Sequence, residues 1–376
     1  MISALERIKA FMKDGADKKI GMLNRYAIGV KELPGRSFAF LFSTPVYYQG
    51  GMPISGRFSK KKELYYFKGS SCLVEITPTG VTFQGEWGDA CIRFETEQEF
   101  VLDEQRRYLQ SKEMKIYPTF NGIAVHQYHT QKTALVFDTT IKSELKPKSN
   151  GKYFAYRVEK HRPSFVINAM FAQNSAQTVF SGIRLTSKKK SATQYQIALQ
   201  SMDAAAEHLA WEANFYEPKL IQDTTVESKN PKANNVYGDV AFLGSTRDFG
   251  TQYLYLRFDY DKLSDIKTTD IARVTLHIPY YGIQGNSFQA SAPFARFCSF
   301  ESNWKNQMGS IDFPVDCTVG EGVVSFDLSK YMLTDRGSLI VTNGIVLRMT
   351  GKKDYAILAT ADNYFTPQIL EFEYKK

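Results

Sequence analysis

Hydrophobic and polar positions alternate along much of the chain, and the clearest example is the stretch 253–260. There Leu254, Leu256 and Phe258 share one face, while the tyrosines and charged residues between them share the other. A period of two residues is typical of a strand with one face in a core. A second alternating run, 272–278, follows after a polar exit loop. The pattern therefore predicts two core strands in this part of the chain.

Between residues 25 and 215 the same pattern recurs in short runs that are separated by turn signals. One run ends at Pro78-Thr79-Gly80, and two others flank Asn121-Gly122. An Asn-Gly pair between apolar runs is a strong β-hairpin signal. We find no helical period here that is long enough to cross over a parallel sheet. The region is therefore expected to be a sandwich or barrel and not a set of βαβ units.

Two segments have helical character. Ile2, Leu5, Ile8 and Met12 fall at helical spacing, which predicts a short amphipathic helix at the N-terminus. This helix would pack on its own domain or dock into a larger assembly. The Ala-rich segment 201–211 predicts a short packed helix or an irregular connector, and Pro218 disfavours helix for the residue before it.

These elements give an expected domain organisation. With 376 residues the chain is long enough for two domains that each bury a core. We expect an N-terminal helix or docking segment at 1–24, a β-rich sandwich domain at 25–216 and a second β domain at 217–376. The expected fold class is all-β, with two tandem β-sandwich domains of jelly-roll type and a short N-terminal helix.

Charge and composition narrow the classes of partner. The net charge is +8 and aromatic residues make up 14% of the chain, which is a globular composition that permits anionic partners. The lysine runs 60–62 and 188–190 fall in polar, hairpin-like loops without interleaved aromatics. They are expected to be solvated loops and not a nucleic-acid patch. No stretch approaches the roughly 20 apolar residues of a membrane span.

The cysteines and the N-terminus indicate the compartment of synthesis. Cys72, Cys91, Cys298 and Cys317 are too few and too scattered for a disulfide framework, so free thiols are expected. Charged residues interrupt the apolar stretch at the N-terminus, which predicts that it is not a secretory signal. Both observations favour synthesis in a reducing cytoplasm.

Candidate chemistry in the sequence is sparse. His126 and His129 would lie on opposite faces of a strand, which argues against joint metal ligation. Asp223 and Asp239 flank an Asn-rich loop that could coordinate Ca²⁺, although such loops are more often turns. We assign no catalytic residues. Asp259 is one of a few carboxylates that could serve a glycan-processing enzyme, which is the minor alternative.

The order of motifs in the last part of the chain carries a family resemblance. The motifs are Tyr-Leu-Arg-Phe-Asp at 255–259, the strand 272–278, Trp304, Phe-Asp-Leu-Ser at 326–329, Gly-Ile-Val-Leu at 344–347 and Pro-Gln-Ile-Leu at 367–370. Over residues 218–376 this order resembles the DNRLRE-type domains of bacterial surface proteins and phage-related proteins. The contiguous string that names the family is absent from this chain. The resemblance implies a jelly roll or sandwich like those of carbohydrate-binding modules, in which Asp327 is structural.

Two non-enzymatic functions follow from the resemblance and the composition. The first is a structural component of a phage or phage-derived particle, such as a baseplate, fibre or decoration protein. Such a protein would assemble in the bacterial cytoplasm as a homo-oligomer with other particle proteins. The second is a module that binds surface glycans by stacking sugars on exposed aromatic rings. The candidate rings are Trp304, Tyr280, Tyr281 and Trp87, with core packing or a turn position as the alternative for each.

Overall fold

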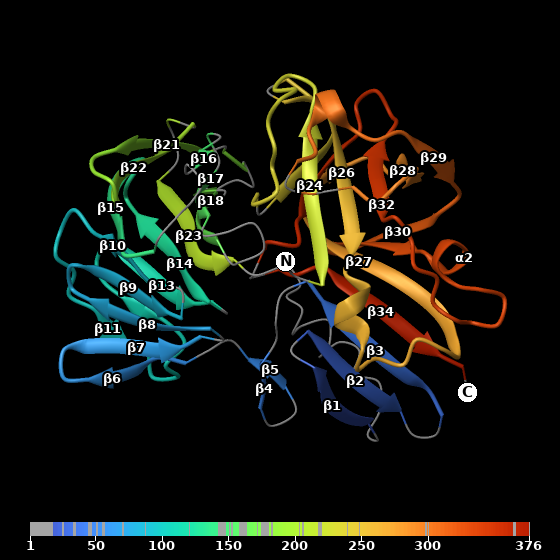
Figure 1. The fold of residues 1–376 in the computed structure, drawn as a ribbon, viewed down its shortest axis with the longest axis horizontal. Coiled ribbons are helices and arrows are strands. Elements are labelled where there is room, and N and C mark those ends of the chain that lie inside the picture. Colours follow the sequence, from blue (N-terminus) through green and yellow to red (C-terminus); the bar gives the residue numbers. More distant parts are fainter. Residues whose placement is uncertain are drawn as a thin grey trace. The chain divides into compact units, whose positions relative to one another are not determined.

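The computed structural model shows an all-β chain that divides into two compact units (Figure 1). Unit 1 comprises Met1–Ile54 together with Lys219–Lys376, and unit 2 comprises Ser55–Pro218. The structure describes residues 18–375 with gaps at 25, 33–34, 44–46, 50–51, 55–56, 70, 87, 120, 142–147, 150, 152, 158–163, 171, 174–179, 182, 203, 205–206, 217–219, 239, 248, 298, 300 and 364–365.

Unit 2 consists mainly of two eight-stranded antiparallel sheets. The strands of the first sheet, in spatial order, are β21 (Ile183–Lys189), β22 (Gln194–Ser201), β15 (Lys132–Thr139), β10 (Gly88–Arg93), β9 (Gly80–Gly85), β8 (Cys72–Thr77), β7 (Leu64–Lys68) and β6 (Ser59–Lys61). The strands of the second sheet are β11 (Val101–Leu102), β12 (Leu109–Gln110), β13 (Met114–Pro118), β14 (Gly122–Tyr128), β23 (His208–Tyr216), β18 (Ser164–Met170), β17 (Tyr153–Arg157) and β16 (Lys148–Ser149).

One hydrophobic core joins the two sheets of unit 2. Phe83 and Phe137 from the first sheet belong to the same buried cluster as Phe165 and Trp211 from the second. Phe137 and Phe165 stack with ring centroids 5.2 Å apart. Alternation produces this core, because every second residue of strands such as β8 and β13 is buried. Unit 2 is therefore a β-sandwich, as the sequence pattern predicts.

Unit 1 is built on one large, folded, antiparallel sheet system. One part contains β1 (Lys18–Asn24), β2 (Ala27–Glu32), β3 (Ser37–Phe42), β34 (Ile369–Tyr374), β27 (Ile271–Gln284), β31 (Val323–Asp327) and β30 (Asp316–Gly320). The other part contains β33 (Tyr355–Ala359), β25 (Val240–Thr246), β26 (Gly250–Phe258), β24 (Ile221–Glu227), β32 (Ile345–Met349), β28 (Phe288–Pro293) and β29 (Ser310–Phe313).

The long strand β27 belongs to both parts of this sheet system. Its first half pairs with β34 and β31, and its last residues pair with β33 after a register shift between Tyr280 and Gly282. Figure 1 shows β27 in orange beside β34 in red. A bulge of this kind bends a strand and lets it turn a corner. The core cluster of unit 1 combines Leu254 and Phe258 of β26 with Leu276 of β27 and Phe372 of β34.

Short elements complete the description. Among the described residues of unit 1 there are three single-turn helices: η1 (Tyr260–Leu263), η2 (Trp304–Asn306) and α2 (Ser329–Met332). Two small strand pairs are β4 (Tyr47–Gln49) with β5 (Met52–Ile54), and β19 (Ala172–Gln173) with β20 (Phe180–Ser181). In the portion of the chain that the structure describes, no helix has the length and apolar character needed to cross a membrane.

Two expectations about helices differ from the structure. The helix or connector expected at 201–211 is wrong for its second half, because β23 begins at His208 and pairs with β14 and β18. Residues 18–24 of the expected N-terminal docking segment form the strand β1. The helical stripe at residues 2–12 lies outside the described residues.

The unit boundaries also differ from the expected domains at one end. The division at residue 218 agrees with the boundary expected near 217. The segment 25–54, however, was expected in the first β domain, whereas it belongs to unit 1. Its strand β3 pairs with β34, with Leu41 opposite Leu370. Alternation identifies a strand but not its partner, which explains the difference.

Candidate functional site

Five ring side chains lie on the outer face of the second sheet of unit 2. Along β13 and at the end of β14, buried residues alternate with partly exposed ones, so the period of two places Tyr117, His126 and Tyr128 on one face. His208 begins β23 and pairs with Tyr128, and Tyr108 contacts Tyr117 from the chain just before β12. All five are partly exposed. We call them the ring row: Tyr108, Tyr117, His126, Tyr128 and His208.

The row contains two groups of rings that are in contact at aromatic distances. The ring centroid of Tyr117 lies 5.6 Å from that of Tyr108 and 5.4 Å from that of His126. Tyr128 and His208 meet edge to face at 5.4 Å. These are ordinary separations for aromatic pairs, in which neighbouring rings hold each other in place. The row is therefore a preorganised surface.

Burial favours the neutral form of two rings of the row, Tyr117 and His126. Burial raises the pKa of Tyr117 to about 12, and the neighbouring Tyr128 and Tyr108 raise it further. Burial also lowers the pKa of His126 below its usual value, with additional effects from His208 and Lys115. Tyr117 is then a neutral phenol and His126 a neutral imidazole. Neutral rings with a hydroxyl and ring nitrogens can stack on one face of a ligand and hydrogen-bond to its edge.

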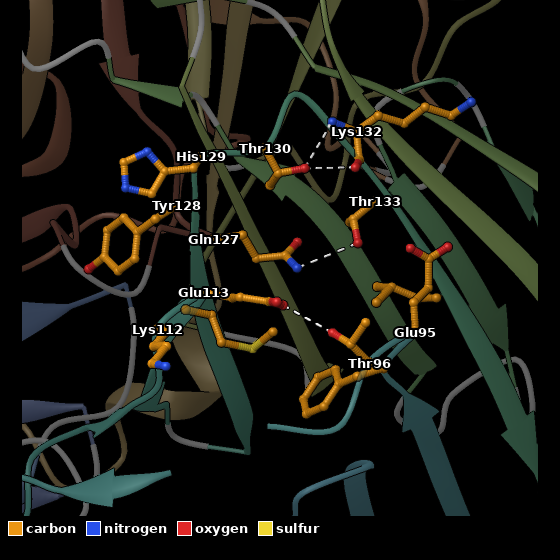
Figure 2. A pocket seen from close by; sticks show the side chains of 13 residues that line it. Glu95, Thr96, Lys112, Glu113, Gln127, Tyr128, His129, Thr130, Lys132 and Thr133 are labelled. Carbon is orange, nitrogen blue, oxygen red and sulfur yellow. Dashed lines mark hydrogen bonds between the residues drawn. The ribbon is translucent and has the colours of Figure 1, made fainter. Parts of the chain in front are cut away.

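A pocket of about 370 Å³ adjoins one end of the ring row and has Tyr128 in its wall. Figure 2 shows that its polar groups come from three segments: the chain after β10, the turn before β13, and the run from the end of β14 to the start of β15. Gln127 donates to Thr133 at 3.5 Å, and Thr96 donates to Glu113 at 3.0 Å. The wall therefore contains amide, hydroxyl and carboxylate groups, together with two lysines and three apolar side chains.

The polar wall is anchored to the core. The indole N–H of Trp211 donates to the side-chain oxygen of Gln127 at 3.1 Å, and both side chains are buried. Gln98 is also buried, and it donates to Glu113 at 2.8 Å while accepting from Ser111 at 2.7 Å. Because buried polar groups with all their bonds made are costly to move, these groups hold a fixed geometry.

A second pocket, of about 720 Å³, shares Lys112 and Glu113 with the first and has Tyr108 in its wall. The two pockets therefore adjoin the row near both of its ends, at Tyr128 and at Tyr108. Lys115 places its amino group 4.9 Å above the ring of Tyr108. Together the row and the pockets offer flat rings beside fixed hydrogen-bonding groups, which is the composition of a site for a polar, ring-shaped ligand.

The structure places Trp304, the first candidate from the sequence, in unit 1 within η2. Its ring lies 5.2 Å from the ring of Tyr253, at an interplanar angle of 34°. Both rings pack against a small cluster that includes Tyr255 and Phe297. This cluster covers the face of β26 opposite to Leu254, so Trp304 is half-buried and supports the sheet.

The other candidate rings are not brought together with Trp304 in that cluster. Tyr280 packs against the main core of unit 1, and its hydroxyl donates to the carbonyl of Gly320 at 3.1 Å. The hydroxyl of Tyr281 lies 2.8 Å from that of Thr366. Trp87 lies outside the described residues.

The weak calcium candidate Asp223 is a buried residue of β24. Its carboxylate accepts a hydrogen bond from the backbone N–H of Ala361 at 2.7 Å and one from Gln368 at 3.2 Å. Asp239 lies outside the described residues. Within the described ranges, no group of three or more His, Cys, Asp or Glu side chains has the arrangement of a metal site.

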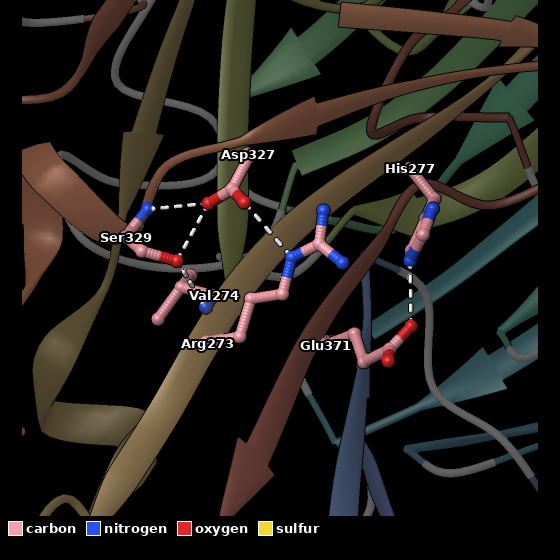
Figure 3. A network of polar contacts seen from close by, with 6 residues as sticks. All are labelled: Arg273, Val274, His277, Asp327, Ser329 and Glu371. Atoms are coloured by element: carbon pink, nitrogen blue, oxygen red, sulfur yellow. Dashed lines mark hydrogen bonds and ion pairs between the residues drawn. The ribbon is translucent and has the colours of Figure 1, made fainter. Parts of the chain in front are cut away.

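Two polar networks in unit 1 join neighbouring strands (Figure 3). Asp327 accepts from the Ser329 hydroxyl at 2.6 Å and from Arg273 at 2.8 Å. Burial opposes its ionisation, but these hydrogen bonds outweigh burial, so the pKa of Asp327 is lowered. The Nδ1 atom of His277 lies 2.7 Å from the hydroxyl oxygen of Ser325, and its Nε2 atom lies 2.7 Å from a carboxylate oxygen of Glu371. Both networks join β27 to neighbouring strands in the interior of the sheet.

Sequence reasoning missed the ring row, although one signal for part of it was present. A tight turn at Asn121-Gly122 fixes the register of the hairpin, which sets Lys115 opposite His126 and Tyr117 opposite Ala124. That register alone places three members of the row on one face. His208 joins them only through the pairing of β14 with β23, which sequence periodicity does not reveal.

No protein-family model matches the chain, and no curated protein matches it significantly.

Proposed function

We propose that this chain is a non-enzymatic structural component of a phage or phage-derived particle, and that it contacts surface glycans through the ring row of unit 2. The ring row is the observation that carries the glycan contact. The row combines partly exposed rings, among them the neutral Tyr117 and His126, with two pockets whose hydrogen-bonding groups are held in place by the core.

The ring row suits a sugar because of the two kinds of surface that a sugar presents. The apolar C–H face of a pyranose stacks on aromatic rings, and its hydroxyls need donors and acceptors at the edge. Tyr117 and Tyr128 supply rings, while Thr96, Glu113 and Thr133 supply polar groups beside them. Because burial favours the neutral forms of Tyr117 and His126, these two rings do not require a charged ligand.

The use of the titratable groups supports the non-enzymatic part of the proposal. Asp327 ends β31, and its bonds to Ser329 and Arg273 hold the start of α2 and the adjacent strand β27. His277, which is buried, links Ser325 on β31 to Glu371 on β34. These titratable side chains therefore hydrogen-bond neighbouring strands to one another. The particle assignment itself rests on the motif order in 218–376 and its resemblance to phage-related domains.

The glycan contact is tested by retention of the full chain on purified bacterial cell-wall polysaccharide. The variants Tyr108→Ala and Tyr128→Ala should each weaken binding about tenfold, because loss of one stacking ring costs about 1.4 kcal/mol. Affinity measured by titration calorimetry provides the comparison.

A matched control comes from the other sheet of unit 2. Tyr66 on β7 is also partly exposed, but it lies outside the row, so Tyr66→Ala should leave affinity unchanged. The variant Trp304→Ala tests the platform expected from the sequence in unit 1. Loss of retention with Trp304→Ala alone, while both row variants bind normally, would move the site to unit 1. Absence of retention for the unaltered chain would remove the glycan contact.

A further inference from the structure

The outer face of the first sheet of unit 2 carries basic side chains toward one edge of the sheet. The four strands at that edge are β21, β22, β15 and β10, in that order. Buried residues on these strands face the core, and the residues that alternate with them point outward. Four of the outward residues are cations, and all four are exposed. We call them the basic frame: Arg184, Lys188, Lys132 and Arg93.

Two cations of the frame flank one glutamine. Arg184 on β21 and Lys132 on β15 are both opposite Gln200 on β22, one from each side. Because neighbouring strands lie about 4.8 Å apart, the backbones of the two cations are separated by roughly 10 Å. Gln200 is itself exposed, so a side-chain amide lies between the two charges.

The other two cations flank a second glutamine, further along the same strands. Lys188 lies four residues after Arg184 on β21 and is opposite Gln196. Val136 separates Gln196 from Arg93, which is the last residue of β10. Four residues of a strand span roughly 14 Å, so the frame encloses an area of about 10 by 14 Å or slightly more. Its four corners are positive, and its sides carry amides.

The frame has few counterions. Arg93 forms an ion pair with Asp138 at 3.7 Å, whereas the other three cations have no ion-pair partner among the described residues. β21 and β22 contain no acidic residue, and Asp89 lies at the opposite end of β10 from Arg93. Glu95, two residues after Arg93, lines the first pocket. Three exposed cations without counterions give this face a positive potential that attracts anions.

The kind of polyanion that fits the frame follows from the side chains around it. The aromatic residues on these four strands, Phe137 and Tyr195, both belong to the core. Single-stranded nucleic acids are held largely by stacking on exposed rings, and the groove of a duplex admits a helix or a two-stranded ribbon. A sheet face without rings suits neither of them. A chain of charged sugars needs only cations for its anionic groups and amides for its hydroxyls.

We propose that the basic frame binds an acidic polysaccharide, which is a sugar chain that carries carboxylate or sulfate groups at intervals. The cations pair with the anionic groups, and Gln200 and Gln196 hydrogen-bond to sugar hydroxyls between them. The frame lies on the outer face of the first sheet, whereas the ring row lies on the outer face of the second. This is therefore a second site, and it rests neither on the ring row nor on the particle assignment.

The experiment measures the affinity of the full chain for sodium polygalacturonate and for dextran sulfate by titration calorimetry at low salt. The unaltered chain should bind at least one of the two polymers, and the tighter one identifies the anionic group. Added salt should weaken binding, because salt screens exposed charge pairs. Arg184→Gln and Lys188→Gln should each weaken binding about fivefold, the size expected for one exposed charge pair. Arg184→Lys, which keeps the charge, should retain most of the affinity.

A matched control removes one lysine at the opposite edge of the same sheet. Lys61 on β6 is exposed, so Lys61→Gln changes the net charge equally and should leave affinity unchanged. Neutral dextran measures any binding that needs no charge. Equal losses in Lys61→Gln and Arg184→Gln would show that net charge alone attracts the polymer, and they would overturn the proposal. Absence of binding to both acidic polymers would also overturn it.

Nucleic acid is the competing occupant, and an oligothymidylate with the same number of charges tests it. It should bind more weakly than the acidic polysaccharide, because the frame offers no ring for its bases. Tighter binding of the oligothymidylate, weakened by Arg184→Gln and Lys188→Gln, would assign the frame to nucleic acid and overturn the proposal.

The two sites of unit 2 are tested with separate variants and can fail separately. Lys132 belongs to the frame and also lines the first pocket, so the variants alter Arg184 and Lys188 instead. Tyr108→Ala and Tyr128→Ala leave the four cations in place. Loss of polygalacturonate or dextran sulfate binding with Arg184→Gln, but not with the two tyrosine variants, places the acidic chain on the frame.

Discussion

His126 is a side chain whose protonation the surrounding structure opposes. It lies within the ring row on β14, and burial, with His208 and Lys115 nearby, lowers its pKa below the ordinary value of 6.5. The folded state therefore binds a proton at this position less readily than the unfolded state does. The contribution of His126 to the free energy of unfolding is therefore complete above pH 6.5, and it is lost as the pH falls below that value.

We expect the free energy of unfolding to decrease between about pH 7.5 and about pH 5.5, and to decrease less in the variant His126→Gln. Urea denaturation at both pH values measures the difference. The control is His129→Asn, since His129 is exposed beside the first pocket and Asn tolerates its positive φ of 54°. Equal pH dependence in the unaltered chain and in His126→Gln would contradict this prediction.

Single residues were predicted well wherever one face of a strand meets the main core. Leu254, Leu256 and Phe258 are buried, as alternation indicated. Tyr255, on the opposite face, is also buried, because Phe297 and Trp304 from a loop distant in sequence cover it. A period of two identifies the face of a strand that packs against the main core. It does not reveal that a loop covers the other face.

At the scale of elements, β25 depends on a glycine where two strands approach it. Gly244 pairs with Gln252 on β26 and with Tyr355 on β33, and its φ is +95°. A Cβ at this position would overlap the carbonyl oxygen of Asp354. Both the positive φ and the close backbone approach favour glycine here.

The variant Gly244→Ala should destabilise the chain by more than Gly151→Ala. Gly151 has a similar φ of +87° but open space where a Cβ would lie, so its substitution costs only the backbone strain of about 1–2 kcal/mol. The excess loss in Gly244→Ala then measures the overlap with Asp354. Thermal unfolding of both variants gives the comparison, and equal losses would show that β25 can shift to accept the methyl group.

Most strands could be predicted, but their partners and one element type could not. The hairpin at Asn121-Gly122 is confirmed, with Pro118 opposite Ile123. The Ala-rich segment 201–211 was expected to be a short packed helix or an irregular connector. From His208 the chain instead forms strand β23, because it pairs on both sides, with β14 and β18, and because Trp211 and Phe215 complete the core. Such long-range pairing overrides a weak local preference.

At the scale of the molecule, unit 1 is assembled from two separated stretches of chain. Ala39 and Leu41 of β3 belong to the same core cluster as Leu370 and Phe372 of β34. The backbone N–H of Ser43 donates to the carbonyl oxygen of Gln368 at 2.9 Å, and the backbone N–H of Gln368 donates to the hydroxyl oxygen of Ser43 at 3.0 Å. The stretch 219–376 is therefore only part of a structural unit.

The isolated fragment 219–376 should lack a cooperative unfolding transition, because removal of β1–β3 exposes one side of β34 together with apolar core surface. The fragment 55–218 should unfold cooperatively, since it contains both sheets of its sandwich. Calorimetry of the two fragments tests this. A sharp transition in 219–376 would show that β1–β3 are dispensable for its core.

The pairing of β3 with β34 also has a consequence for the time course of synthesis. Phe42 lies opposite Ile369, so the partner of β3 is made about 330 residues later. At a translation rate of ~5–20 residues per second, the ribosome needs roughly 15–65 s to produce it. All of unit 2 emerges during that interval and has time to fold first. Until then, Ala39 and Leu41 remain uncovered beside an unpaired strand edge, so we expect the nascent chain to bind chaperones.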